Sequence, residues 1–133
     1  MSDRIKIEVD VIIPVHNASS TVKETVLSAL DQEIPSSASQ LLQSFLKKYV
    51  VSSAVCCYDD GSKDDSLQIL RQIESSRSGK NVASKSSDRM IPSKLLVGSG
   101  NTEIGRGAGY ARNRAIELNN VPLQEKKLSL IHI

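Results

Sequence analysis

Four carboxylates lie close together in the segment CCYDDGSKDDS, residues 56–66. Such a cluster could bind a metal, accept a phosphoryl group, cap a helix or accept hydrogen bonds from a ligand. An EF-hand loop needs Gly at its sixth position and an oxygen ligand at its third. Counting back from Gly61 places Tyr58 at that third position, and a phosphoryl-accepting D-x-D-G motif would also need an acid there. The residues therefore exclude both an EF-hand and a phosphoaspartate site of this type.

Helix capping and ligand binding are the remaining roles for these acids. Ser62 can accept hydrogen bonds from the first amides of a following helix, while Asp64 and Asp65 complement its positive end. Capping explains Asp59 and Asp60 less well, because both precede the cap at the mouth of a strand. A carboxylate at that place can accept hydrogen bonds from a nucleobase N–H or a ribose hydroxyl. We expect capping from the second pair of acids and ligand binding from the first pair.

The elements that would position these acids alternate along the chain. Apolar, β-branched runs predict strands near residues 7–15, 49–58 and 94–98. Apolar residues at helical spacing predict helices that begin near Thr21, Asp64 and Ala108, with a shorter helix around residues 41–46. This alternation predicts an α/β fold whose mostly parallel sheet is flanked by helices. Ligands bind at the carboxyl edge of such sheets, where the acidic cluster would lie.

Two further stretches would meet a ligand at the same edge. His16 and Asn17 follow Pro14 at the mouth of the first strand; a lone histidine there is more often a loop residue than a catalyst, and two histidines do not make a Ser-His-Asp or Cys-His set. The segment GRGAGY fails the Rossmann pattern G-x-G-x-x-G, because Tyr110 holds the last place. A glycine turn at a helix start beside Arg106 still suits a diphosphate. A tight turn with solvated arginines is the alternative.

The composition is that of one soluble domain. The 133 residues are 39% hydrophobic and 24% charged, with a formal charge of +2. So small a charge, with few aromatic residues, gives no reason to expect a nucleic acid partner. The adjacent Cys56 and Cys57 would point to opposite faces of a strand, so we expect neither a disulfide nor a shared metal site. Free thiols, with no signal peptide or membrane segment in the sequence, favour a cytoplasmic location.

Three separated stretches resemble one protein family. VDVIIPVHNASSTVKETVLSALDQ, VCCYDDGSKDDSLQIL and GRGAGYARNRAIELN are similar, in order and spacing, to the family-2 nucleotide-sugar glycosyltransferases. The combination of PVHNA with RGxGYA most resembles the UDP-GlcNAc:galactose β-1,3-N-acetylglucosaminyltransferase-like proteins. The resemblance implies the GT-A fold and transfer of a sugar, N-acetylglucosamine in that subgroup, from a UDP-sugar to the hydroxyl of an unknown acceptor.

The same resemblance assigns residues to the donor nucleotide. By motif position, the expected donor-nucleotide-binding residues are Pro14, Val15, His16, Asn17, Asp59, Asp60, Gly61, Arg106 and Arg112. Pro14 and His16 would line the uridine site, and Asp60 would accept the uracil N3–H. Arg106 or Arg112 would approach the diphosphate. Gly105 and Ala18 depart from the Asn and Glu that are usual in the family, which leaves the donor contacts around them open.

Full-length members of the family bind Mg²⁺ or Mn²⁺ through a D-x-D motif after the next strand. No Asp follows Asp88 here, so we assign no metal ligand and no catalytic residue. We expect residues 1–119 to form the nucleotide-sugar-binding part of a GT-A domain, with a flexible insertion over 77–90. Residues 120–133 form a divergent tail, which is either a short fourth strand over 128–133 or a scar of truncation or cloning. Both interpretations predict an inactive fragment; a module that binds nucleotide or a partner without catalysis is the alternative function.

Overall fold

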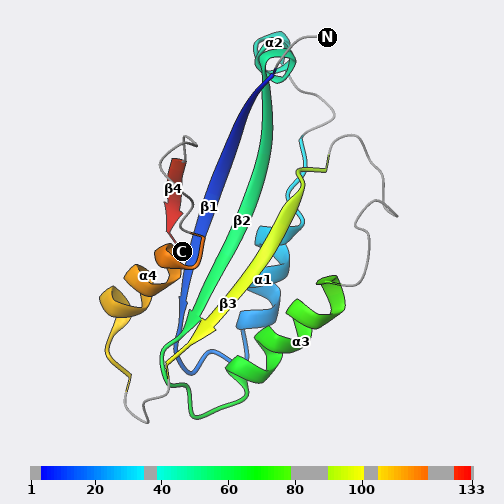
Figure 1. Ribbon diagram of the computed structural model, residues 1–133. Helices are drawn as coiled ribbons and strands as arrows, with labels where there is room; N and C mark the ends of the chain where they lie inside the picture. The colour runs from blue at the N-terminus through cyan, green and yellow to red at the C-terminus, as the bar shows by residue number, and fades with distance from the viewer. Residues whose placement is uncertain (1–3, 35–38, 79–89, 101–104, 120–127, 133) are drawn as a thin grey trace.

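The computed structural model describes residues 4–34, 39–78, 90–100, 105–119 and 128–132, which form one parallel sheet with helices on both faces (Figure 1). The elements in chain order are β1 (Ile5–Val15), α1 (Val22–Leu30), α2 (Gln40–Lys48), β2 (Tyr49–Asp59), α3 (Ser66–Ser78), β3 (Ser93–Ser99), α4 (Ala108–Glu117) and β4 (Leu128–His132). The strands lie in the order β3-β2-β1-β4, and each neighbouring pair is parallel. The predicted α/β fold with a parallel sheet is therefore confirmed.

Alternation along the strands divides the interior into two cores. On one face, odd-numbered residues of β1 and β2 such as Val11, Ile13 and Val55 pack against α1 and α3. On the other face, Ile12 and its neighbours in β2 pack against the alanines of α4. Both faces of the central strands are covered over their carboxyl halves, as the continuous apolar run in β1 requires.

The two cysteines follow the same alternation. Cys57 belongs to the core beneath α1 and α3, whereas Cys56 belongs to the core beneath α4; both are buried, and neither is part of a disulfide. Burial raises the pKa of the Cys57 thiol to about 12, with a smaller contribution from the neighbouring Cys56. These thiols therefore act as small core residues, and the expectation that they form no disulfide with each other is met.

Two predicted boundaries differ from the structure. Helix α3 begins at Ser66, two residues after the expected start, and it continues to Ser78. The first two residues of the expected flexible insertion, 77–90, are therefore helical, and most of the rest lies outside the described residues. In the tail, β4 is a strand that pairs with β1 at the edge of the sheet.

No helix among the described residues is long and apolar enough to cross a membrane.

Candidate functional site

The loops that follow β1 and β2 are joined through Asn17. Its backbone amide donates to the hydroxyl of Ser62 at 2.8 Å, and its side-chain oxygen accepts from the backbone amide of Lys63 at 2.8 Å. Asn17 holds a positive φ of 49°, a conformation that Asn tolerates better than most residues. These bonds fix the PVHN turn against the DDGS turn, so the ends of both strands form one surface.

Asp64 also links the two loops, through hydrogen bonds from Ser19 and Ser66. Its carboxylate accepts from the backbone amide and the hydroxyl of Ser66, at 3.0 and 2.5 Å, and from the backbone amide of Ser19 at 3.1 Å. The hydrogen bond from the Ser66 hydroxyl is the largest cause that lowers the pKa of Asp64, to about 2. Since Ser66 begins α3, the predicted role of Asp64 at the start of this helix is confirmed.

Ser62 does not cap α3, and that prediction is wrong. Its hydroxyl accepts from Asn17, as described above, and donates to Asp59 at 2.5 Å. The other carboxylate oxygen of Asp59 accepts from the backbone amide of Ser62 at 3.1 Å. Asp59 is buried, so both of its oxygens shape the DDGS turn from within. Gly61 allows this turn, because its φ of 68° lies in the left-handed region.

Asp60 bridges the end of β2 and the start of α4. One carboxylate oxygen accepts from the backbone amide of Arg106 at 2.9 Å, and the other accepts from that of Gly107 at 2.8 Å. These amides directly precede α4, where a helix offers unpaired N–H groups and a positive dipole end. Asp60 is only 3% exposed, and its backbone amide also donates to Val15 at 2.8 Å. The acid therefore ties three segments into one site.

His16 is held in one tautomer by its neighbours. Its Nδ1 lies 2.8 Å from the carbonyl oxygen of Asp60, and because a carbonyl can only accept, Nδ1 must carry the proton. In the neutral ring Nε2 is then an acceptor, and it lies 3.2 Å from the side-chain nitrogen of Asn17. These two contacts fix the orientation of the imidazole ring at the carboxyl end of β1.

A pocket of about 600 Å³ opens between these groups. It is lined by Pro14, Val15, His16, Asp60, Gly105, Gly107, Ala108 and Ala111. Its volume is within the range of small-molecule sites, and it lies at the carboxyl edge of the sheet, where α/β folds bind ligands. The small residues of the GRGA turn leave this space open. Gly105 is required there, because a Cβ would lie 2.9 Å from the Asp60 carbonyl oxygen and 3.0 Å from the His16 ring.

The structure thus brings four of the predicted site residues to the pocket, namely Pro14, Val15, His16 and Asp60. Asn17 and Gly61 lie in the two loops that support them, and Asp59 is the last residue of β2. The pocket-lining residues 105, 107, 108 and 111 were not among the predicted site residues. The glycine-rich turn was the sequence feature that could have identified them. It was interpreted as a diphosphate site because of its arginines, whereas in the structure its small residues line the pocket.

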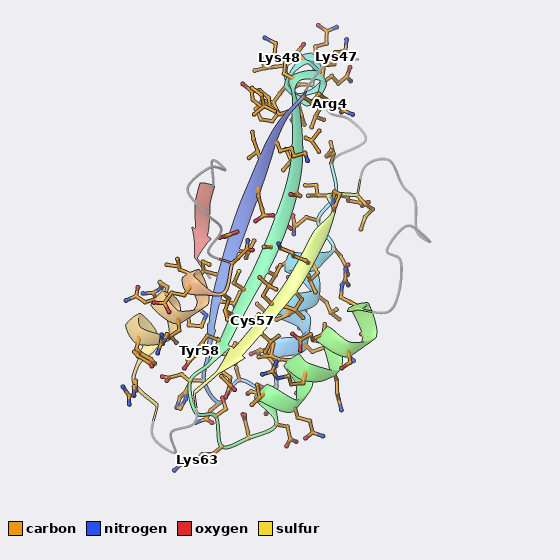
Figure 2. All side chains as sticks on the ribbon, in the orientation of Figure 1. Arg4, Lys47, Lys48, Cys57, Tyr58 and Lys63 are labelled. Atoms are coloured by element: carbon orange, nitrogen blue, oxygen red, sulfur yellow. The ribbon has the colours of Figure 1, made fainter. Side chains whose placement is uncertain are left out.

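Two arginines lie beside Tyr110, namely Arg106 just before α4 and Arg114 within it. The guanidinium carbon of Arg106 is 5.2 Å from the centre of the Tyr110 ring, and that of Arg114 is 5.4 Å away. Arg114 also donates to the Tyr110 hydroxyl at 3.1 Å, which lowers the pKa of Tyr110. Tyr110 packs edge-on against Tyr58. Tyr58 is the next-to-last residue of β2 and lies near the carboxyl end of that strand (Figure 2). Arg112 is half-buried and does not line the pocket.

The described residues do not fit a divalent cation by themselves. No three His, Cys, Asp or Glu side chains converge on one point within the part of the chain that the structure describes. The carboxylates of Asp59 and Asp60 both accept hydrogen bonds from protein donors on each oxygen. No metal ligand is therefore assigned among the described residues.

The fold and the pocket define an α/β domain with a pocket of small-molecule size at the carboxyl edge of a parallel sheet. The chain belongs to glycosyl transferase family 2, whose family model matches residues 10–90. This match runs from the middle of β1 to the segment before β3, so it includes the PVHN and DDGS turns and leaves out α4. Comparisons with curated proteins and with solved structures gave no significant match. Membership of the family implies a nucleotide-sugar donor.

Proposed function

We propose that this chain binds the nucleotide of a UDP-sugar in the pocket beside Asp60. In the family reaction the sugar, N-acetylglucosamine in this proposal, would move to an acceptor hydroxyl, whereas the chain as given would bind the donor without transferring it. The observation that carries the proposal is the convergence of the PVHN and DDGS turns on one pocket of about 600 Å³. Both turns belong to the segment that matches the glycosyltransferase family.

The lining residues offer distinct contacts to such a donor. Pro14 and Val15 supply apolar surface for the nucleobase, and the fixed imidazole of His16 forms one side of the base site. Asp60 would accept the uracil N3–H, since each carboxylate oxygen keeps acceptor capacity after taking one amide. Arg106 would lie on the diphosphate side through its position in the exposed turn before α4.

A module that binds nucleotide without catalysis is the second candidate function. It is favoured by one observation, which is that Asp59, Asp60 and Asp64 each accept hydrogen bonds that hold the loops together. None of these three is therefore a ready general base for an acceptor hydroxyl.

A pocket-filling substitution tests the proposed site. Ala108→Phe places an aromatic side chain at an exposed lining position, so it should abolish binding of UDP-N-acetylglucosamine in calorimetry without disturbing the core. Gly109→Ala is the matched control, because an added Cβ at that neighbouring position meets no atom within 4 Å. Unchanged affinity in Ala108→Phe would place the nucleotide elsewhere and overturn the assignment.

A further inference from the structure

The amino ends of β1 and β2 project beyond the other two strands and carry α2 at their end (Figure 1). β3 pairs with β2 only from Ser53 onward, and β4 pairs with β1 only from Val9 onward. The sheet is therefore two-stranded in this region. We refer to residues 4–7 and 39–51 as the basic tip.

The basic tip carries large apolar side chains that are exposed to water. Among the described residues, the exposed large hydrophobic side chains are Ile5, Leu41, Phe45 and Val50. Leu41 is 82% exposed and lies four residues before Phe45, so the two share one side of α2. α2 has no fully buried residue, although its sequence is amphipathic. Exposed apolar side chains that gather at one place mark an interaction surface.

The charges of the basic tip all have one sign. Its charged residues are Arg4, Lys6, Lys47 and Lys48, and no Asp or Glu occurs in the sequence from Ile34 to Tyr58. Figure 2 shows Arg4, Lys47 and Lys48 together at this end, with Lys63 at the opposite end of the molecule. The ion pairs found within the described residues involve none of these four basic side chains. The surface is thus apolar and cationic.

We propose that the basic tip docks end-on onto an anionic lipid surface. Leucine and phenylalanine on a short helix enter the interface between headgroups and acyl chains, while neighbouring lysines attract anionic headgroups. The apolar residues lie on a projecting end rather than in a groove. A lipid surface can accept such an end without a complementary shape, which favours lipid over an acidic protein.

Docking in this orientation would leave the pocket free. The pocket lies at the carboxyl end of β1, whereas Arg4 and Ile5 lie at its start. From its first to its last Cα atom, the 11-residue strand β1 spans roughly 33 Å, at about 3.3 Å for each step between residues. The strands would therefore hold the nucleotide site well above the lipid headgroups, open to a soluble donor.

Sedimentation with lipid vesicles tests the proposal on the whole chain. The chain should bind vesicles that contain phosphatidylserine, and it should bind vesicles of phosphatidylcholine alone much more weakly. High salt should release it, because exposed charges are then screened. Binding that is equal for both vesicle types, or no binding to either, would overturn the proposal without any substitution.

Variants locate the contact. Lys47→Gln combined with Lys48→Gln should weaken binding to phosphatidylserine vesicles by about 25-fold, at roughly fivefold for each lysine. Leu41→Ser combined with Phe45→Ser should weaken binding while preserving its dependence on salt. Lys63→Gln, at the opposite end, is the matched control and should bind as the unmodified chain does.

A partner other than lipid would give a different result. If the tip pairs with a second copy of the chain, sedimentation equilibrium would show a dimer that Leu41→Ser with Phe45→Ser dissociates, and vesicles would not be bound. If Lys63→Gln weakened vesicle binding as much as the double lysine variant, attraction would come from overall charge. Either outcome would contradict docking through the basic tip.

Discussion

The carboxylate of Asp60 accepts a hydrogen bond from the backbone amide of Gly107 at 2.8 Å, across 47 positions of the sequence. Its other oxygen accepts from the adjacent amide of Arg106. One buried side chain therefore fixes the start of α4 against the end of β2. The pocket exists because these two elements are held at this separation.

Asp60→Asn should destabilise the fold. Asparagine keeps one acceptor oxygen but turns an NH₂ group toward the second amide, so a part-buried backbone N–H loses its partner. Such a loss costs about 1–3 kcal/mol. Urea denaturation should show this decrease in the free energy of unfolding, whereas the exposed Asp65→Asn should change it by less than about 0.5 kcal/mol. Equal stabilities for the two variants would show that the Asp60 contact is not structural.

Gly105→Ala should be destabilising for a steric reason. The new Cβ would lie 2.9 Å from a backbone oxygen, which cannot move aside without shifting the DDGS turn. We expect a loss of about 1–3 kcal/mol, as for other overpacked sites. Gly109→Ala lies four positions away in α4 and should be neutral or stabilising by up to about 1 kcal/mol. Thermal unfolding of both variants measures the difference, and a stable Gly105→Ala would mean that the turn lies further from Asp60.

Asp64 should make stability depend on pH in the acid range. Its pKa is lowered in the folded protein from the ordinary value of 3.8 to about 2, mainly by the hydrogen bond from Ser66. A lowered pKa stabilises the fold above the unfolded value, and this contribution disappears as the pH falls through the folded value. The stability difference between the unmodified chain and Asp64→Asn should therefore be full at neutral pH and vanish towards pH 2. A difference that does not change with pH would contradict the role of the charge.

The sequence predicted the order of elements well, because the strands that lie beneath helices are apolar on both faces. It could not predict the contact between Asp60 and α4, since nothing local links a carboxylate to amides 46 positions away. Ser62 shows the same limit, because its preference for capping was overridden by Asn17, which tertiary folding brings within 2.8 Å. In α2 the apolar periodicity was read correctly as a helix, yet Leu41 is exposed. The spacing of apolar residues predicts that a helix has an apolar face, but it does not predict which part of the protein packs against that face.

The chain as given should release no UDP from UDP-N-acetylglucosamine above background, with Mn²⁺ and varied sugar acceptors present. Sugar transfer needs an acceptor hydroxyl held close to the anomeric carbon and stabilisation of the departing charge. Asp59, Asp60 and Asp64 are engaged in hydrogen bonds within the loops. Metal-dependent turnover that Asp59→Asn abolished would show that this acid is catalytic.

Calorimetric titration of the chain with UDP and with CDP measures whether the pocket binds uridine through Asp60. Uracil presents an N3–H donor, whereas cytosine presents an acceptor at that position. The hydrogen bond to a charged group is worth roughly 1.5–3 kcal/mol, so UDP should bind more than about tenfold tighter than CDP. Asp60→Asn should remove most of this preference; if Asp60 only positions α4, both affinities would fall together and the preference would remain. Equal affinities of the unmodified chain for UDP and CDP would show that Asp60 does not accept the uracil N3–H.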